Sequence, residues 1–211
     1  MSLEENCKIL IENIEKLSDI DINSGGKRRA AKGSYNEYFI LCMIKDILDN
    51  NNFYKIFKQP KMLKIHNIHP DIIICDAVRV DNQEEADFKV IENKENNFYK
   101  INNERCIFIV EIKDYFDFPM MRRFISECFS YKKKYNNIKF LAVDIHRSVE
   151  NDRVSEYLTD FDLILNDNFY YCNLLQITRN SKYQNILLNY KDEIYNLSLM
   201  LNNKIKEIIL G

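Results

Sequence analysis

Three ionisable residues stand at the ends of two apolar segments, where charged side chains are uncommon. Asp71 follows Pro70 and opens the apolar run Ile72–Cys75, while Glu111 and Lys113 come at the end of a second, longer apolar run. Side chains two positions apart on a strand point the same way, so we expect Glu111 and Lys113 to share one face. Burying a carboxylate and an ammonium there is costly unless they are paired or bind something.

These residue types are suited to metal-assisted hydrolysis of a phosphodiester. Adjacent strands lie about 4.8 Å apart, so Asp71 and Glu111 can share one divalent cation if their strands are neighbours. Hard oxygen ligands select Mg²⁺, with Mn²⁺ as a substitute. Such a cation polarises a phosphate and helps to ionise a bound water. Lys113 would hold or deprotonate that water and stabilise negative charge on the phosphate.

The surrounding segments predict an α/β domain, in which helices flank a mixed central β-sheet. Amphipathic periodicity and breakers predict helices at 2–17, 34–50, 118–135, 151–158 and 181–210. Apolar and β-branched runs predict strands at 53–57, 62–65, 71–76, 106–113, 138–144, 161–165 and 169–177. Residues 77–103 are polar and irregular, with short strand candidates near 88–91 and 98–101, and we expect them to form an excursion on the same sheet.

The length of 211 residues suits a single domain. We expect its core at about 34–165, with an N-terminal helix at 2–18 and a C-terminal helix at 181–210. No apolar run approaches the roughly 20 residues of a transmembrane helix, and the acidic N-terminus lacks a signal-peptide pattern. The six cysteines are scattered without a zinc-type spacing. These observations favour a cytoplasmic protein without a membrane partner.

The net charge of −2 excludes a protein that coats nucleic acid by charge alone. An enzyme acting on nucleic acid would therefore have to concentrate its positive charge locally. Lys27, Arg28, Arg29 and Lys32 form such a cluster in an expected loop at 23–33, and they are the candidate contacts to a DNA backbone. The alternative is that the loop is only solvated.

The spacing of Pro70-Asp71 and Glu111-Ile112-Lys113, forty positions later, resembles the PD-(D/E)xK nuclease superfamily, which has the restriction-endonuclease-like fold. Glu37, on the preceding predicted helix, matches an acidic residue that many members carry there. The predicted helix and strand after Lys113 also match the family core. The resemblance covers roughly residues 34–144.

The resemblance implies a role for each matching residue. Asp71 and Glu111 would bind the metal, Lys113 would position the nucleophilic water, and Glu37 would support a second metal or a water. It further implies a Mg²⁺-dependent endonuclease of double-stranded DNA, as in type II restriction enzymes. A homodimer would place one site on each strand of a palindromic target.

Other interpretations of these residues stay open at this point. Glu111 and Lys113 can form a structural salt bridge, and Asp71 can cap a turn after Pro70. Ser34 and Glu37 have the spacing of a capping box, so Glu37 can simply begin a helix. If the strand register is shifted, Asp76 replaces Asp71.

The biological role also has alternatives. The same chemistry would serve a repair, recombination or mobile-element nuclease that acts on DNA structure. The fold can also serve as a catalytically inactive module that binds DNA or protein.

Overall fold

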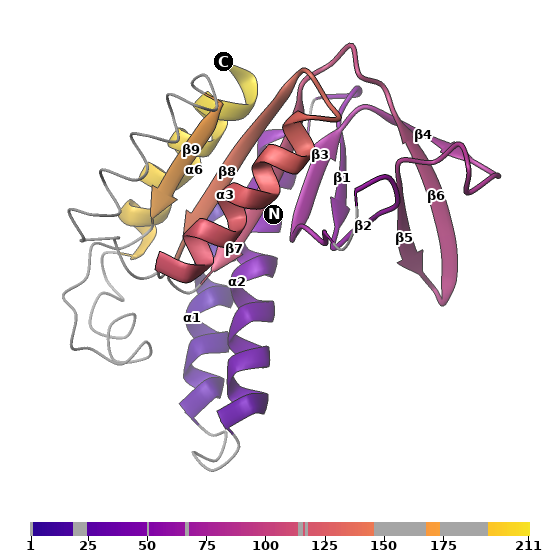
Figure 1. The fold of residues 1–211 in the computed structure, drawn as a ribbon. Coiled ribbons are helices and arrows are strands. Elements are labelled where there is room, and N and C mark those ends of the chain that lie inside the picture. The colour runs from indigo at the N-terminus through magenta and orange to yellow at the C-terminus, as the bar shows by residue number, and fades with distance from the viewer. Residues whose placement is uncertain are drawn as a thin grey trace.

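A mixed five-stranded sheet forms the centre of the computed structural model (Figure 1). Its strands, in spatial order, are β1 (Lys55–Lys58), β3 (Ile72–Cys75), β7 (Ile107–Lys113), β8 (Ile138–Asp144) and β9 (Phe169–Asn173). The first three pair antiparallel, whereas β7, β8 and β9 pair parallel. The structure describes residues 2–18, 25–49, 51–65, 68–113, 116, 118–145, 168–173 and 194–211. The predicted α/β class is therefore confirmed.

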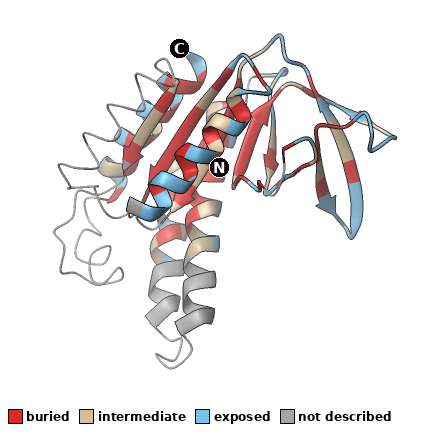
Figure 2. Ribbon diagram, viewed as in Figure 1, coloured by how far each residue is buried: buried red, intermediate tan, exposed pale blue. Residues whose placement is uncertain are grey.

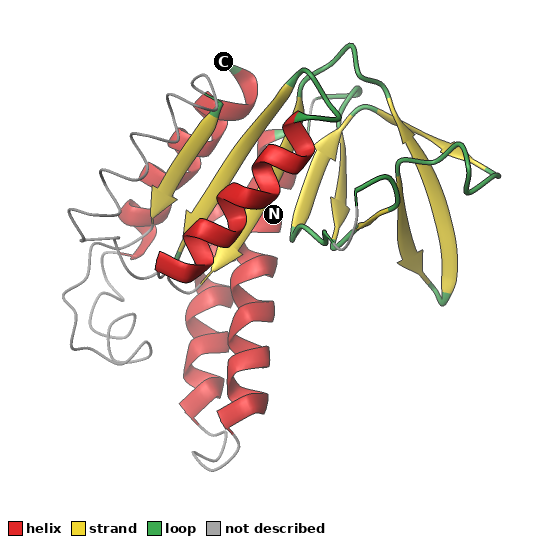
Figure 3. Cartoon of the chain, viewed as in Figure 1, coloured by secondary structure: helices red, strands yellow, loops and turns green. Residues whose placement is uncertain are grey.

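Helices cover both faces of this sheet (Figures 1 and 3). On one face, side chains of α1 (Leu3–Ser18), α2 (Gly25–Ile47) and α6 (Ile194–Leu210) share a core with the sheet. On the other face, α3 (Phe118–Lys132) packs against the same strands. The central strands are buried almost throughout (Figure 2). Because they are covered on both faces, their residues are nearly all apolar. Polar side chains at their ends are therefore exceptional.

The N-terminal helix begins as the sequence predicts. The Ser2 amide donates to Glu5 Oε2 at 2.8 Å, and the Glu5 amide donates to Ser2 Oγ at 3.2 Å, which is a capping box. Farther along α1, the buried Asn6 Nδ2 donates to the Phe39 carbonyl at 2.9 Å and ties α1 to α2.

The prediction of a loop at 23–33 is wrong for its larger part, because α2 is already helical from Gly25. All six residues of 27–32 are Lys, Arg or Ala, which have high helix propensity. α2 also lies beside α1 (Figure 1), and most helix stability in proteins comes from tertiary packing rather than propensity. Ser34 and Glu37 therefore lie inside α2, and the proposed helix-starting capping box does not exist. Glu37 is left without that structural role.

The expectation that residues 77–103 extend the central sheet is wrong, because they form most of a second sheet. This antiparallel sheet consists of β2 (Lys61–Met62), β5 (Phe88–Glu92), β6 (Glu95–Ile101) and β4 (Ala77–Val80). Both sides of β3 are already occupied by β1 and β7, so the excursion has no ladder position beside β3. It packs through Phe88 and Tyr99, whose rings each lie 4.7 Å from the ring of Phe57.

Several predicted elements fall outside the described residues. These are the helix at 151–158, the strand at 161–165 and residues 181–193 of the C-terminal helix. Within the described ranges, no helix combines the length and the apolar character that crossing a membrane requires.

Candidate active site

The register of β3 and β7 brings Asp71 next to Glu111. Ile72 pairs with Val110 in this antiparallel ladder, so one step further along the two strands Asp71 lies opposite Glu111. The Asp71 carboxylate completes the pairing, because its Oδ2 accepts a hydrogen bond of 2.7 Å from the Ile112 amide. The condition set by the sequence, that these two strands be neighbours, is met.

Lys113 joins the two acids. Its Nζ lies 2.6 Å from Glu111 Oε1 and 3.2 Å from Asp71 Oδ2. The prediction that Glu111 and Lys113 share one face is therefore confirmed. Solvent reaches 31% of the Lys113 side chain but only about 15% of each carboxylate side chain. The three charges are thus held in a largely desolvated group at the end of two strands.

The pKa values of Glu111 and Lys113 are both raised above their ordinary values. Burial and the neighbouring Asp71 raise the pKa of Glu111 to about 7, although Lys113 opposes the change. Burial alone would lower the pKa of Lys113, but Glu111 and Asp71 outweigh it and hold that pKa above its ordinary value. Lys113 is therefore an ammonium at neutral pH, while Glu111 is close to its titration midpoint.

Glu37 approaches the same group from α2. Its Oε2 accepts a hydrogen bond of 2.9 Å from Gln59 Nε2 and lies 3.4 Å from Lys58 Nζ. Burial and the charge of Asp71 raise the pKa of Glu37, and the ammonium groups of Lys58 and Lys113 oppose that rise. Glu37 thus interacts electrostatically with the group around Glu111.

Two residues that the sequence analysis passed over, Lys58 and Gln59, hold Glu37 in place. The backbone amide of Gln59 also donates to the backbone carbonyl of Asp71 at 2.8 Å. Its φ of 45° lies in the left-handed region, which is uncommon for a side-chain-bearing residue and costs energy. The only signal in the sequence is the dipeptide Gln59-Pro60, which indicates a turn but not its partners.

Asp144, which the sequence analysis also missed, is the last residue of β8 and the ladder partner of Lys113 in the parallel pairing of β7 with β8. Its side chain is fully buried, and its Oδ2 accepts hydrogen bonds from the Phe116 amide at 3.3 Å and the Tyr171 hydroxyl at 3.0 Å. Asp144 therefore holds the backbone at Phe116, three residues after Lys113. An acid closing the apolar run 138–143 was the available signal.

The structure separates Asp76 from the group. Arg105 Nε lies 3.1 Å from Asp76 Oδ2, and Asn102 Nδ2 donates to the same oxygen at 3.1 Å, beyond the other end of β3. Asp71 is thus the acid that faces Glu111. The proposed DNA contacts Lys27, Arg28, Arg29 and Lys32 belong to the first turns of α2 rather than to a loop, and their side chains lie outside the described part of the chain.

The donor set fits a magnesium ion that keeps most of its water. Among the described residues, no group of three or more His, Cys, Asp or Glu side chains can hold a metal, whereas the two carboxylates of Asp71 and Glu111 lie together at Lys113. Mg²⁺ commonly binds through only one or two carboxylates together with water and substrate phosphate. Within the same described ranges, Asp71 Oδ1 and Glu111 Oε2 accept no hydrogen bond, which leaves one oxygen of each acid for a ligand.

The sequence matches no protein-family model, and no curated protein matches it either.

Proposed function

We propose that the chain is a Mg²⁺-dependent endonuclease that hydrolyses phosphodiester bonds in double-stranded DNA. The observation that carries the proposal is the convergence of Asp71, Glu111 and Lys113 at the ends of two adjacent buried strands. Stability alone does not explain why two acids and a lysine share a largely desolvated position, because buried ion pairs add little to stability. Sites with strongly shifted pKa values are more often functional.

The arrangement of the elements supports a restriction-endonuclease-like fold. A meander of β1, β3 and β7 is followed by α3 and by the parallel strand β8. The order of Glu37, Asp71, Glu111 and Lys113 along these elements agrees with the resemblance to the PD-(D/E)xK superfamily. We therefore extend the family roles to these four residues.

Each side chain would then act through the chemistry it has here. Asp71 is oriented by the Ile112 amide, which leaves its second oxygen for a ligand. When bound, Mg²⁺ supplies Lewis acidity and lowers the pKa of a bound water. Lys113, which stays protonated, donates hydrogen bonds to the attacking water or to the phosphate oxygens and stabilises their charge. It is not suited to accept a proton.

Without a metal, burial and Asp71 raise the pKa of Glu111 to about 7, and a bound Mg²⁺ would favour its ionised form as a ligand. Glu37, held by Gln59 and Lys58, would orient a water at the edge of the site. These assignments predict that charge and shape both matter at position 111.

Cleavage assays test the proposal. The full chain would be incubated with supercoiled plasmid, linear duplex and branched DNA in Mg²⁺ or in EDTA. We expect cleavage only with Mg²⁺, and a loss of at least about 100-fold in Glu111→Gln and Lys113→Met, as for other groups that stabilise a transition state. Glu104→Gln is the control, because Glu104 is exposed in the loop between β6 and β7. Absence of cleavage on all three DNAs, or equal activity in Glu111→Gln, would refute the nuclease.

Calorimetric titration with Mn²⁺ tests the metal separately. We expect binding in the wild type and none in Asp71→Ala or Glu111→Ala. Binding that persists in both variants would remove these acids as ligands, and a wild type that neither binds Mn²⁺ nor cleaves would favour the inactive DNA-binding module.

The pattern of cleavage then assigns the biological role. Discrete fragments from linear DNA, produced by a homodimer in light scattering, would support the type II restriction enzyme that we propose. Cleavage confined to branched or flapped substrates would instead assign a repair, recombination or mobile-element nuclease.

A further inference from the structure

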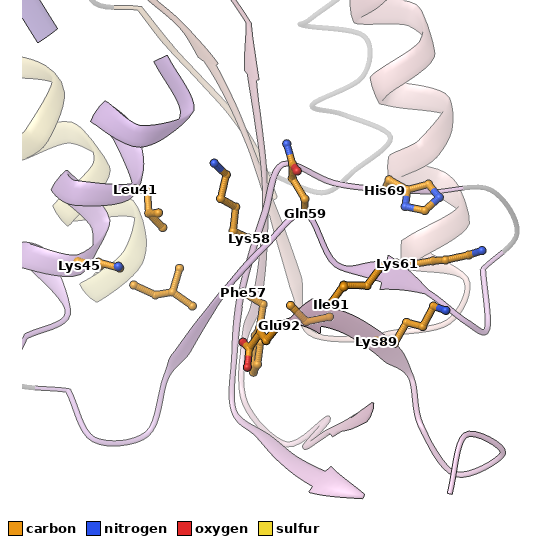
Figure 4. Close-up of a pocket in the computed structure, with 12 residues that line it drawn as sticks. Leu41, Lys45, Phe57, Lys58, Gln59, Lys61, His69, Lys89, Ile91 and Glu92 are labelled. Carbon is orange, nitrogen blue, oxygen red and sulfur yellow. The ribbon is translucent and has the colours of Figure 1, made fainter. Parts of the chain in front are cut away.

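A cavity of about 630 Å³ lies between the central sheet and the second sheet. Leu41 and Lys45 of α2 line it on one side, β1 contributes residues 56–58, and β2 and β5 contribute Lys61 and Lys89 (Figure 4). Of its apolar lining, Leu41, Phe57 and Val90 are buried, whereas Ile91 is 70% exposed. We refer to this cavity as the inter-sheet cleft.

The inter-sheet cleft is strongly basic although the chain as a whole is slightly acidic. Four lysines, at positions 45, 58, 61 and 89, and His69 line it, against the single carboxylate of Glu92. Lys58 is engaged with Glu37. Within the described ranges, no ion pair involves Lys45, Lys61 or Lys89. The cleft therefore carries positive charge that this part of the chain does not neutralise.

Two of these lysines are placed against each other. Lys61 and Lys89 are direct partners in the β2–β5 ladder, and like charges in that position destabilise a sheet. Figure 4 shows both side chains extending to the same side, toward which His69 also lies. This pairing does not favour folding, whereas an anion bound between the two ammonium groups would offset their repulsion.

The inter-sheet cleft borders the candidate active site through two residues, Lys58 and Gln59. Both residues contact Glu37 Oε2. The Gln59 amide donates to the Asp71 carbonyl, and His69 precedes Asp71 by two residues. A linear polyanion that occupies the cleft would thus run toward Asp71 and Glu111.

We propose that the inter-sheet cleft binds the sugar–phosphate backbone of duplex DNA, with Lys61 and Lys89 as its principal phosphate contacts. The proposal rests on the nuclease function for its orientation, since the cleft would lead the backbone to the acids. Contacts of this kind position a duplex without reading its sequence. They also supply the local positive charge that a chain of net charge −2 requires.

Binding of a short labelled duplex in EDTA, followed by fluorescence anisotropy over a range of salt, tests the cleft without cleavage. The variant is Lys61→Glu/Lys89→Glu. Its matched control is Lys133→Glu/Lys134→Glu, which changes the net charge equally at exposed positions after α3. Those control lysines precede β8, so they lie at the opposite end of the parallel strands from Glu111. Circular dichroism would check that all proteins are folded.

We expect the cleft variant to raise the Kd by about 10-fold or more and to reduce the salt slope by about 2, since each phosphate contact contributes about 0.9 to that slope. The control should change the Kd by less than about 3-fold, because it lacks such contacts. Three results would overturn the proposal: a cleft variant that binds as the wild type does, an equal loss in both variants, or a wild type that does not bind duplex DNA.

Mn²⁺ titration and Mg²⁺-dependent cleavage on the same preparations separate this proposal from the proposed function. Loss of DNA binding with unchanged Mn²⁺ binding supports the cleft as a site distinct from the acids. A wild type that binds DNA through the cleft but neither binds Mn²⁺ nor cleaves would retain the cleft and remove the nuclease. If the cleft variant binds DNA, binds Mn²⁺ and cleaves as the wild type does, the nuclease is retained and the cleft proposal is removed.

Discussion

Replacement of Glu111 by Gln is expected to stabilise the folded chain above neutral pH. The Glu111 side chain is about 15% exposed, and burial together with Asp71 raises its pKa from 4.5 to about 7. The folded state therefore binds a proton at this position more tightly than the unfolded state does. The resulting stabilisation is complete below pH 4.5 and is lost as the pH rises through 7.

The size of the effect follows from those two pKa values. Each pKa unit corresponds to about 1.36 kcal/mol, so ionising Glu111 in the folded protein costs at most about 3 kcal/mol of unfolding free energy at pH 8. Gln keeps the shape of the protonated acid and does not titrate. The variant should therefore lack this decline and should exceed the wild type by up to about that amount above pH 7.

Urea unfolding followed by circular dichroism at pH 5, 6, 7 and 8 would measure the difference, with Glu104→Gln as the exposed control. Added Mn²⁺ at pH 8 should stabilise the wild type through binding but leave Glu111→Gln unchanged. Parallel pH profiles for wild type and Glu111→Gln, or a variant that is less stable at pH 8, would refute the assignment of an electrostatic cost to Glu111.

Substitutions at three further positions have defined outcomes. Lys113→Met leaves two neighbouring carboxylates without their cation, so unfolding free energy should fall by about 1–3 kcal/mol in urea titrations at pH 8, while Lys113→Arg should recover stability but not cleavage. Gly33→Ala should raise stability by about 1 kcal/mol in thermal unfolding, because Gly33 lies within α2 and an added Cβ meets nothing within 4 Å; a lower midpoint would contradict this. Lys94→Gly should stabilise the β5–β6 hairpin by about 1 kcal/mol, because φ at Lys94 is 67° and left-handed residues other than glycine are strained; an unchanged midpoint would count against that strain.

The core of the candidate site could be predicted because its geometry follows local rules. The positions of Glu111 and Lys113 on one face require only the alternation of side chains along a strand. The meeting with Asp71 requires in addition that β3 and β7 be neighbours. Sequence could state that as a condition but not establish it, since strand pairing between distant segments is a non-local event.

The parts that could not be predicted share that non-local character. Lys58, the last residue of β1, and Gln59, which follows it, contact Glu37 of α2, and no periodicity links those segments. The extension of α2 back to Gly25 depends on packing against α1, which overrides the loop signal of the glycines. Tertiary contacts decided both outcomes.

The 39 residues between Asp71 and Glu111 also contribute to the inter-sheet cleft. By sequence they lengthen the connection between two acids that must meet. In the fold, the insertion leaves β3 and β7 paired and builds the second sheet, in which Lys89 of β5 comes to lie opposite Lys61 of β2. One wall of the inter-sheet cleft is thus made of the segment that separates the acids. If DNA binding requires that wall, the length of the insertion reflects substrate binding, because the pairing of Asp71 with Glu111 needs no such length.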